Sequence, residues 1–159
     1  MLTLPRPALA FPVTLAETLD LLGTDGADAL VIAGGTDAVP NLKHGLHEPK
    51  RIVHLARVRE LHFVREDAEG LHLGPLVTLT ELTRLPQIQR DYAGVAKAAG
   101  LVASPQIRNM GTLGGSLCQR NRCWYYRDEH VHCLLKGGRK CYATDSIGKS
   151  IAARGRSFW

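Results

Sequence analysis

Hydrophobic residues near the start of the chain recur at helical spacing. Leu15, Leu19 and Leu22 follow one another at intervals of four and three residues, which places them on one face of a helix. Thr14-Leu-Ala-Glu17 is a capping box, in which the Thr hydroxyl accepts an amide of the first turn and the Glu reaches back. The pattern therefore predicts a short helix that begins after Thr14 and ends at Gly23.

Two apolar runs without alternation follow, ALVIAGG (29–35) and RIVHL (51–55). Uninterrupted apolar strands are typical of buried strands in a parallel sheet. The segment from Thr36 to Lys43 between them can form a helix, with Asp37 near its start and Pro40 tolerated only in the first turn. The succession of helix, strand, helix and strand predicts a small parallel α/β unit.

After residue 56 the pattern changes. Two short strands around the turn Asp67–Gly70 predict a hairpin, and Thr78–Glu81 is a second capping box that opens a helix. Residues 91–103 predict a helix rich in small residues, which Ser104-Pro105 ends because proline disfavours helical geometry in the residue before it. The change near residue 56 predicts a border between two α/β subdomains, and the fold class is therefore α+β.

Composition narrows the class of protein. A hydrophobic content of 45% and a charged content of 22% are globular values. No apolar run approaches the roughly 18 residues that span a bilayer. The segment MLTLPRPALAFPVTLAETLDLL lacks the layout of a signal peptide, so we expect a cytoplasmic protein.

The net charge of +5 is concentrated in the last third, where residues 106–159 hold 10 Lys and Arg but 3 Asp and Glu. Such a basic patch attracts phosphate groups, including those of nucleic acid. The segment has neither a helix-turn-helix pattern nor regularly interleaved aromatic residues, so nucleic-acid binding is not favoured.

All four cysteines fall in the same basic segment, at positions 118, 123, 133 and 141. In a reducing cytoplasm this clustering indicates metal or cluster ligation rather than disulfides, and unliganded thiols are the alternative. The spacing is not the C-x2-C pair of a zinc ribbon. His44 and His47 lie one helical turn apart but lack a third ligand, so we expect both at the surface.

Two glycine-rich stretches carry the candidate binding chemistry. AGGTD (33–37) lies between a predicted strand and a helix start, where exposed amides favour an anion; a tight turn without a ligand is the alternative. NMGTLGGS (109–116) predicts a second flexible loop of the same chemistry. Neither is a G-x-G-x-x-G or Walker motif, but together they suit a ligand with two phosphates, such as a dinucleotide. Arg108 is either a phosphate partner or solvated surface.

The order of the segments AGGTDAVPNLKHG, PKRIVHL, LHLGPLVTLTEL and AGLVASPQIRNMGTLGGSL resembles the FAD-binding subunit of the molybdenum hydroxylases, the xanthine dehydrogenase and carbon monoxide dehydrogenase group. The resemblance covers residues 10–127. It implies an FAD-binding domain of the PCMH type with two α/β subdomains, at 1–56 and 57–117, followed by a Cys-containing basic insertion and tail at 118–159.

The same resemblance implies an FAD-dependent oxidoreductase subunit that passes electrons between iron–sulfur centres and an external acceptor or donor. Its partners would be a molybdopterin-containing large subunit and a 2Fe–2S small subunit, with no membrane. The resemblance implies no catalytic residue, because the flavin itself performs the electron transfer. The implied FAD-binding residues are Ile32, Ala33, Gly34, Gly35, Thr36, Asp37, Val102, Ala103, Asn109, Gly111, Thr112, Gly114, Gly115 and Ser116.

The cysteine-rich end is most similar to the beta subunit of 4-hydroxybenzoyl-CoA reductase, in which an insertion carries a 4Fe–4S cluster. This likeness maps Cys123, Cys133 and Cys141 onto three cluster ligands, with no fourth family cysteine in YATDSIGKSIAARGRSFW and Cys118 as a candidate substitute. Ser116 stands where many relatives carry asparagine. The family continues with further strands and a C-terminal domain, so we expect a C-terminally truncated chain with an incomplete FAD site and an unpaired sheet edge.

Three other interpretations stay open at this point. A standalone FAD-linked oxidase has no evident need for clustered cysteines. A non-enzymatic metal- or nucleic-acid-binding module would use the basic, Cys-containing tail. A non-functional truncated gene product would bind no flavin.

Overall fold

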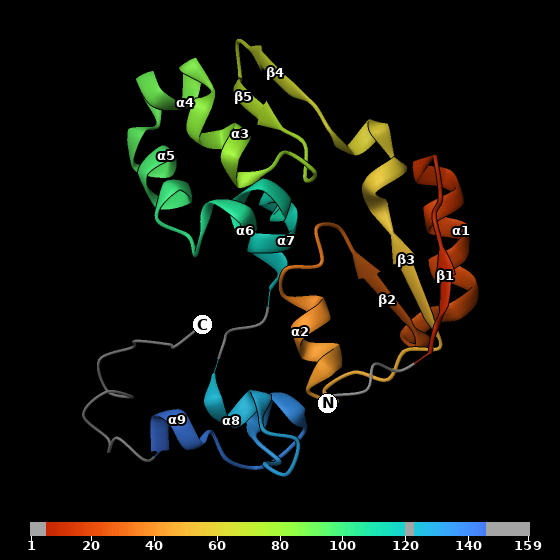
Figure 1. Cartoon of the computed structure of the whole chain (residues 1–159). Coiled ribbons are helices and arrows are strands. Elements are labelled where there is room, and N and C mark those ends of the chain that lie inside the picture. Colours follow the sequence, from red (N-terminus) through yellow and green to blue (C-terminus); the bar gives the residue numbers. More distant parts are fainter. Residues whose placement is uncertain (1–5, 120–122, 146–159) are drawn as a thin grey trace.

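The structure is a computed structural model that describes residues 6–119 and 123–145. It contains a three-stranded parallel sheet, a two-stranded antiparallel hairpin and short helices around them (Figure 1). The predicted α+β class is confirmed. None of the helices in these ranges is both long and apolar enough to cross a membrane.

The parallel sheet has the order β1-β3-β2, with β1 at Ala8–Ala10, β2 at Ala29–Ile32 and β3 at Arg51–His54. The predicted parallel pairing of β2 with β3 is confirmed, and Val31 lies opposite Val53 in its register. Val53 is fully buried, whereas Val31, on the edge strand β2, is 42% exposed. The prediction of a buried strand therefore holds for the two central residues of β3, Ile52 and Val53, and is wrong for β2, which has no buried residue. Strand β1 was not predicted from the sequence.

The first helix, α1, spans Leu15–Asp25 and begins where predicted, because the Thr14 hydroxyl accepts a hydrogen bond from the Glu17 amide. Its predicted end is wrong. The helix continues through Gly23 and ends at Asp25, and its C-cap Gly26 has a positive φ of 54° that glycine adopts readily. A short 3₁₀ turn, η1, at Gly26–Asp28 leads into β2. The predicted second helix, α2, spans Ala38–Lys43.

The second half of the domain begins after two 3₁₀ turns, η2 at Leu55–Arg57 and η3 at Arg59–Leu61. The predicted hairpin is confirmed, with β4 at Val64–Asp67 paired to β5 at Gly70–Leu73. The second capping box is also confirmed, and α3 spans Leu79–Arg84. The core of this half is made of buried apolar side chains, namely Val77, Leu79, Leu82, Ile88 and Ala99.

The helix predicted over 91–103 is wrong in its bounds. The structure has α4 at Pro86–Asp91 and α5 at Ala93–Gly100. α5 ends before Ser104-Pro105, so these two residues do not end it as predicted; instead Pro105 begins α6, which spans Pro105–Met110 with the Ser104 hydroxyl as its N-cap. Proline suits the first position of a helix because its missing N–H has no partner there.

The last described residues, 123–145, form the segment that contains Cys123, Cys133 and Cys141, called the cysteine-containing segment below. It contains α8 at Trp124–Arg127, the 3₁₀ turn η4 at Leu134–Lys136 and α9 at Tyr142–Asp145. Figure 1 shows this segment beside the end of α2, away from the hairpin. Part of the tail of the predicted third region, at 146–159, lies outside the described residues, and the division at 56 and 117 stays a prediction.

Candidate cofactor site

The first glycine turn connects β2 to α2 through residues 33–37. Gly35 has a φ of 70°, a left-handed conformation that side chains with a Cβ adopt only at a cost. Gly34 has a different reason to be glycine: a Cβ placed on it would overlap the main-chain carbonyl of Met110. The two glycines therefore shape this turn for separate reasons, one conformational and one steric.

Several amides in this turn are available to a ligand. The carbonyls of Gly35 and Asp37 accept the amides of Val39 and Asn41, which closes the first turn of α2. Among the residues that the structure describes, no protein atom accepts a hydrogen bond from the amides of Gly35, Thr36 or Asp37. Consecutive main-chain donors without a protein acceptor can bind an anion.

The second glycine stretch is not a flexible loop, and that prediction is wrong. Residues Leu113–Cys118 form a helix, α7, capped by Thr112, whose hydroxyl accepts a hydrogen bond of 3.1 Å from the Gly115 amide. Position 114 in this helix requires a glycine, because a Cβ there would come within 2.6 Å of the Cβ of Pro75. Close packing of a helix against its neighbour, rather than conformational freedom, requires a glycine here.

Main-chain bonds fix the second turn to the rest of the domain. The Leu79 amide donates to the Gly111 carbonyl at 2.9 Å, and the Leu113 amide donates to the Val77 carbonyl at 2.8 Å. Thr112 is buried and forms a β-bridge with Thr78. The N-terminus of α3 thus holds the turn that precedes α7.

The two turns line one cavity of about 300 Å³. Its walls include residues 33–37 of the first turn and Thr112, Gly115 and Ser116 of the second. Asn41, which is buried at 4% exposure, also lines it, and its Oδ1 has no hydrogen-bond partner among the described residues. A buried polar atom without a partner is costly unless a ligand or water satisfies it. The cavity therefore offers both donors and an acceptor to a polar ligand.

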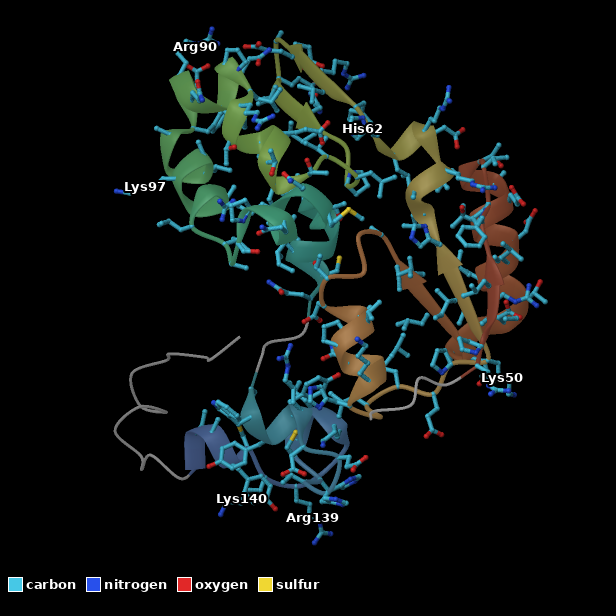
Figure 2. All side chains as sticks on the ribbon, in the orientation of Figure 1. Lys50, His62, Arg90, Lys97, Arg139 and Lys140 are labelled. Carbon is cyan, nitrogen blue, oxygen red and sulfur yellow. The ribbon has the colours of Figure 1, made fainter. Side chains whose placement is uncertain are left out.

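A second cavity of about 520 Å³ is lined by both Gly34 and Met110, and it shares Ala33, Gly34 and Thr112 with the first. His62 lines it, and its Nε2 lies 3.0 Å from the Oε1 of Glu81. In Figure 2, His62 lies between the hairpin half and the parallel-sheet half of the domain. Burial would raise the pKa of Glu81, but hydrogen bonds from the Thr78 amide and hydroxyl and from His62 outweigh burial and hold that pKa below its ordinary value.

Comparison with known families identifies the domain. The model of the FAD binding domain in molybdopterin dehydrogenase matches residues 6–129. The chain belongs to this FAD-binding family.

Individual relatives agree with the family. The chain is 34% identical to the carbon monoxide dehydrogenase medium chain of Hydrogenophaga pseudoflava, over 71% of this chain and 39% of that relative. It is 36% identical to the nicotinate dehydrogenase FAD-subunit of Eubacterium barkeri, over 67% of this chain and 36% of that relative. The chain therefore spans about two fifths of the length of the curated relatives that it matches.

Solved structures show the same fold. Carbon monoxide dehydrogenase from Hydrogenophaga pseudoflava, in a form that lacks the Mo-pyranopterin moiety, superposes with a TM-score of 0.70 at 33% identity, over 72% of this chain and 40% of that chain. Quinoline 2-oxidoreductase from Pseudomonas putida 86 superposes with a TM-score of 0.68 at 34% identity, over 72% and 40%. The closer likeness to the 4-hydroxybenzoyl-CoA reductase beta subunit stays a prediction.

The residues of this FAD-binding domain fit the cofactor that the family binds. FAD carries a diphosphate, and the unpaired amides of the first turn, with the Thr36 hydroxyl beside them, are donors for such a group. The predicted residues that line the first cavity are Ile32, Ala33, Gly34, Gly35, Thr36, Asp37, Thr112, Gly115 and Ser116.

Other predicted site residues lie elsewhere in the FAD-binding domain. Asn109 lines the second cavity, and its Oδ1 accepts a hydrogen bond of 2.7 Å from the Thr80 hydroxyl. Gly111 lines neither cavity, although a Cβ there would lie 3.5 Å from the Thr36 Oγ1, and Gly114 packs on Pro75.

Val102 and Ala103 also line neither cavity. Their carbonyls accept hydrogen bonds of 2.8 Å and 3.3 Å from the Arg108 guanidinium. Ala103 has a φ of 42°, an uncommon value for a residue with a Cβ. Arg108 therefore stabilises a bend of the main chain. The sequence indicated only a phosphate partner or solvated surface for this residue.

Seven residues that line the first cavity were not predicted from the sequence, namely Leu30, Val31, Ala38, Asn41, His47, Cys118 and Gln119. The prediction that His47 lies at the surface is wrong, because it is half-buried in this wall, whereas His44 is exposed as predicted. Cys118 and Gln119 closely follow the predicted glycine stretch in the sequence, and this closeness could have indicated that they line the same site.

No disulfide joins the four cysteines; Cys133 is buried, Cys118 is exposed, and Cys123 and Cys141 are half-buried. Within the described ranges, the one group of three metal-binding side chains whose ligand atoms all lie within 4.8 Å of each other is Asp67, Glu69 and His72 in the hairpin. None of the cysteines belongs to that single-ion group, and the assignment of Cys123, Cys133 and Cys141 as cluster ligands stays a prediction.

Proposed function

We propose that this chain holds FAD as the electron-transfer subunit, or part of that subunit, of a molybdenum-containing hydroxylase or dehydrogenase. The observation that carries the proposal is the convergence of the two predicted glycine turns on one cavity. Turns that come from distant parts of the sequence meet there because Gly34 lies against the main chain of Met110. The family match supplies the identity of the cofactor.

The residues divide into distinct roles in this proposal. The amides of Gly35, Thr36 and Asp37 bind the diphosphate, and the Thr36 hydroxyl adds a donor. Thr112 positions the second turn, because its hydroxyl and carbonyl already bond the Gly115 amide and the Ser116 side chain. The Ser116 hydroxyl donates to the Thr112 carbonyl at 2.8 Å, so its oxygen is left as an acceptor for a ligand hydroxyl.

Bound FAD supplies the electron transfer, and the protein binds and orients the cofactor. The relatives are named as a medium chain and an FAD-subunit, which places those proteins in multi-subunit enzymes. By analogy we propose a molybdopterin-containing large subunit and a 2Fe–2S small subunit as partners, and a cytoplasmic location. The partners, the location, the substrate and the external electron acceptor are all properties of the whole complex.

We also propose that Cys123, Cys133 and Cys141 bind an iron–sulfur cluster. The assignment is supported by the clustering of these cysteines, none of which forms a disulfide, in one short segment. Reconstitution with iron and sulfide, followed by visible spectroscopy, tests this assignment: serine at each of the three positions should reduce the cluster absorption. Unchanged absorption in all three variants would contradict it.

Titration of the full chain with FAD tests the main proposal. We expect saturable quenching of flavin fluorescence with one FAD per chain, and weaker binding of riboflavin, which lacks the diphosphate. Thr36→Val should weaken FAD binding, and Thr24→Val, on the exposed side of α1, should not. No saturable binding of FAD, or equal affinity for FAD and riboflavin, would contradict the proposed diphosphate site.

A further inference from the structure

The cysteine-containing segment is attached to the FAD-binding turn through two consecutive residues of α8. Tyr126 is 2% exposed, and its hydroxyl lies 3.5 Å from the Nε2 of His47. Arg127 points to the first glycine turn, where its Nη2 lies 3.4 Å from the Oδ1 of Asp37. Both His47 and Asp37 line the first cavity. One face of α8 therefore reaches the wall of the proposed FAD site.

Asp37 presents an electrostatic problem for an anionic ligand. Its carboxylate belongs to the same turn as the amides that would bind the diphosphate, and like charges repel strongly where water is partly excluded. The side chain of Asp37 is only 20% exposed, so solvent screens this charge incompletely. The turn needs a neighbouring positive charge to bind an anion tightly.

The structure supplies that charge from α8. The Oδ2 of Asp37 accepts a hydrogen bond of 3.0 Å from the Asn41 side-chain amide, which is neutral. Within the described part of the chain, Arg127 is the cation within 4.0 Å of Asp37, and its own side chain is 23% exposed. By contrast, Arg139 and Lys140 of the same segment are exposed, and Figure 2 shows them on the side away from α2.

We propose that Arg127 is a positioning residue for the cofactor. By neutralising and orienting Asp37, it allows the first glycine turn to bind the diphosphate, so the cysteine-containing segment is a functional part of the FAD site. This inference rests on the proposed function. It assigns a role to a residue outside both glycine turns, and it makes cofactor affinity depend on the docking of α8.

A double-mutant cycle on the full chain tests the inference, with the dissociation constant for FAD measured by fluorescence titration. Arg127→Gln should weaken FAD binding on the order of tenfold, because it leaves a partly buried carboxylate unpaired beside the diphosphate. The same substitution in an Asp37→Asn background should change the affinity less than about twofold, because no charge is left to neutralise. Arg127→Lys should retain most of the affinity.

Arg139→Gln is the matched control, since it removes one positive charge from the same segment without touching the cavity. It should leave FAD affinity unchanged. Circular dichroism of each apo variant checks folding, and if Arg127→Gln does not fold, Arg127→Met with the same Asp37→Asn cycle replaces it.

Two results would overturn the inference while leaving the proposed function intact. One is tight FAD binding by Arg127→Gln. The other is a loss of affinity on Arg127→Gln that is equally large in the chain with native Asp37 and in the Asp37→Asn background, which would mean that Arg127 acts independently of this carboxylate. Failure of the unaltered chain to bind FAD would instead contradict the proposed function itself, together with the inference built on it.

Discussion

Gly34 lies so close to the main-chain carbonyl of Met110 that even one methyl group on Gly34 would overlap this oxygen. This contact joins the turn after β2 to the end of α6, two segments that are far apart in the sequence. Gly34 also lines both cavities. The geometry of the proposed FAD site therefore depends on the absence of a side chain at one position.

The first prediction concerns this contact. Gly34→Ala should lower the free energy of unfolding by about 1–3 kcal/mol, because the added Cβ meets main chain, which cannot rotate away. It should also weaken FAD binding by moving the first turn away from the second. Urea unfolding and FAD titration of the same preparation measure both effects.

Gly23→Ala is the control for Gly34→Ala. Gly23 lies within α1 and a Cβ there would meet nothing within 4 Å, so alanine should stabilise the protein by roughly 0.5–1 kcal/mol through helix propensity. Equal stability changes in the two variants would contradict the steric role of Gly34.

The second prediction concerns Gly114, which packs against Pro75 from within α7. Alanine is normally favoured over glycine in a helix by about 1 kcal/mol, yet Gly114→Ala should destabilise the protein because its Cβ would lie 2.6 Å from the Cβ of Pro75. Gly94→Ala, in α5 with open space around it, should be neutral or stabilising. Thermal unfolding compares the pair, and a stabilised Gly114→Ala protein would show that α7 does not pack on Pro75.

The third prediction concerns the N-cap of α7. Thr112→Val removes the hydroxyl that accepts the Gly115 amide, and this should lower the free energy of unfolding by about 1 kcal/mol. Because Thr112 lines both cavities, the affinity for FAD should fall as well. Ser104→Ala removes the equivalent cap of α6 and should destabilise without an equal loss of FAD affinity. Identical FAD affinity in Thr112→Val and the unaltered chain would argue against the second turn as part of the site.

The fourth prediction is a pH dependence set by Glu81. Its pKa is held below the ordinary value of 4.5 in the folded protein, so its contribution to stability is fully present above about pH 4.5 and is lost as the pH falls through the folded-state pKa. Glu81→Gln should therefore be less stable than the unaltered chain at pH 7, by only about 0.5 kcal/mol because solvent screens this half-exposed carboxylate. The difference should shrink as the pH is lowered below 4.5. Urea unfolding across this range measures it, and a difference that grows on acidification would contradict the assignment.

Local signals predicted much of the fold because they act over a few residues. The Thr78 and Glu81 capping box and the turn at Asp67–Gly70 follow from neighbours in the sequence. The parallel pairing of β2 with β3 follows from the order of helices and strands along the chain. The three-residue strand β1 is too short to give such a signal.

Other features depend on contacts between distant residues, which the sequence does not display. A glycine required by close packing, such as Gly114, cannot be distinguished in the sequence from one required by its φ, such as Gly35. The stretch 109–116 was for this reason predicted as a loop, although most of it is helical. Asn41 and His47 line the cavity together with residues of α7, and Arg127 reaches Asp37 because α8 docks there.

In the proposed site both glycine turns bind one FAD, and hydrogen–deuterium exchange of the full chain with and without FAD measures whether they do. The amides of Gly35, Thr36 and Asp37 have no protein acceptor among the described residues, so they should exchange rapidly in the apo protein. Addition of FAD should slow exchange in peptides covering residues 33–37 and 111–116 together, at the same FAD concentration. If saturating FAD slows amide exchange in only one of these segments, or in neither, the two turns do not form one FAD site.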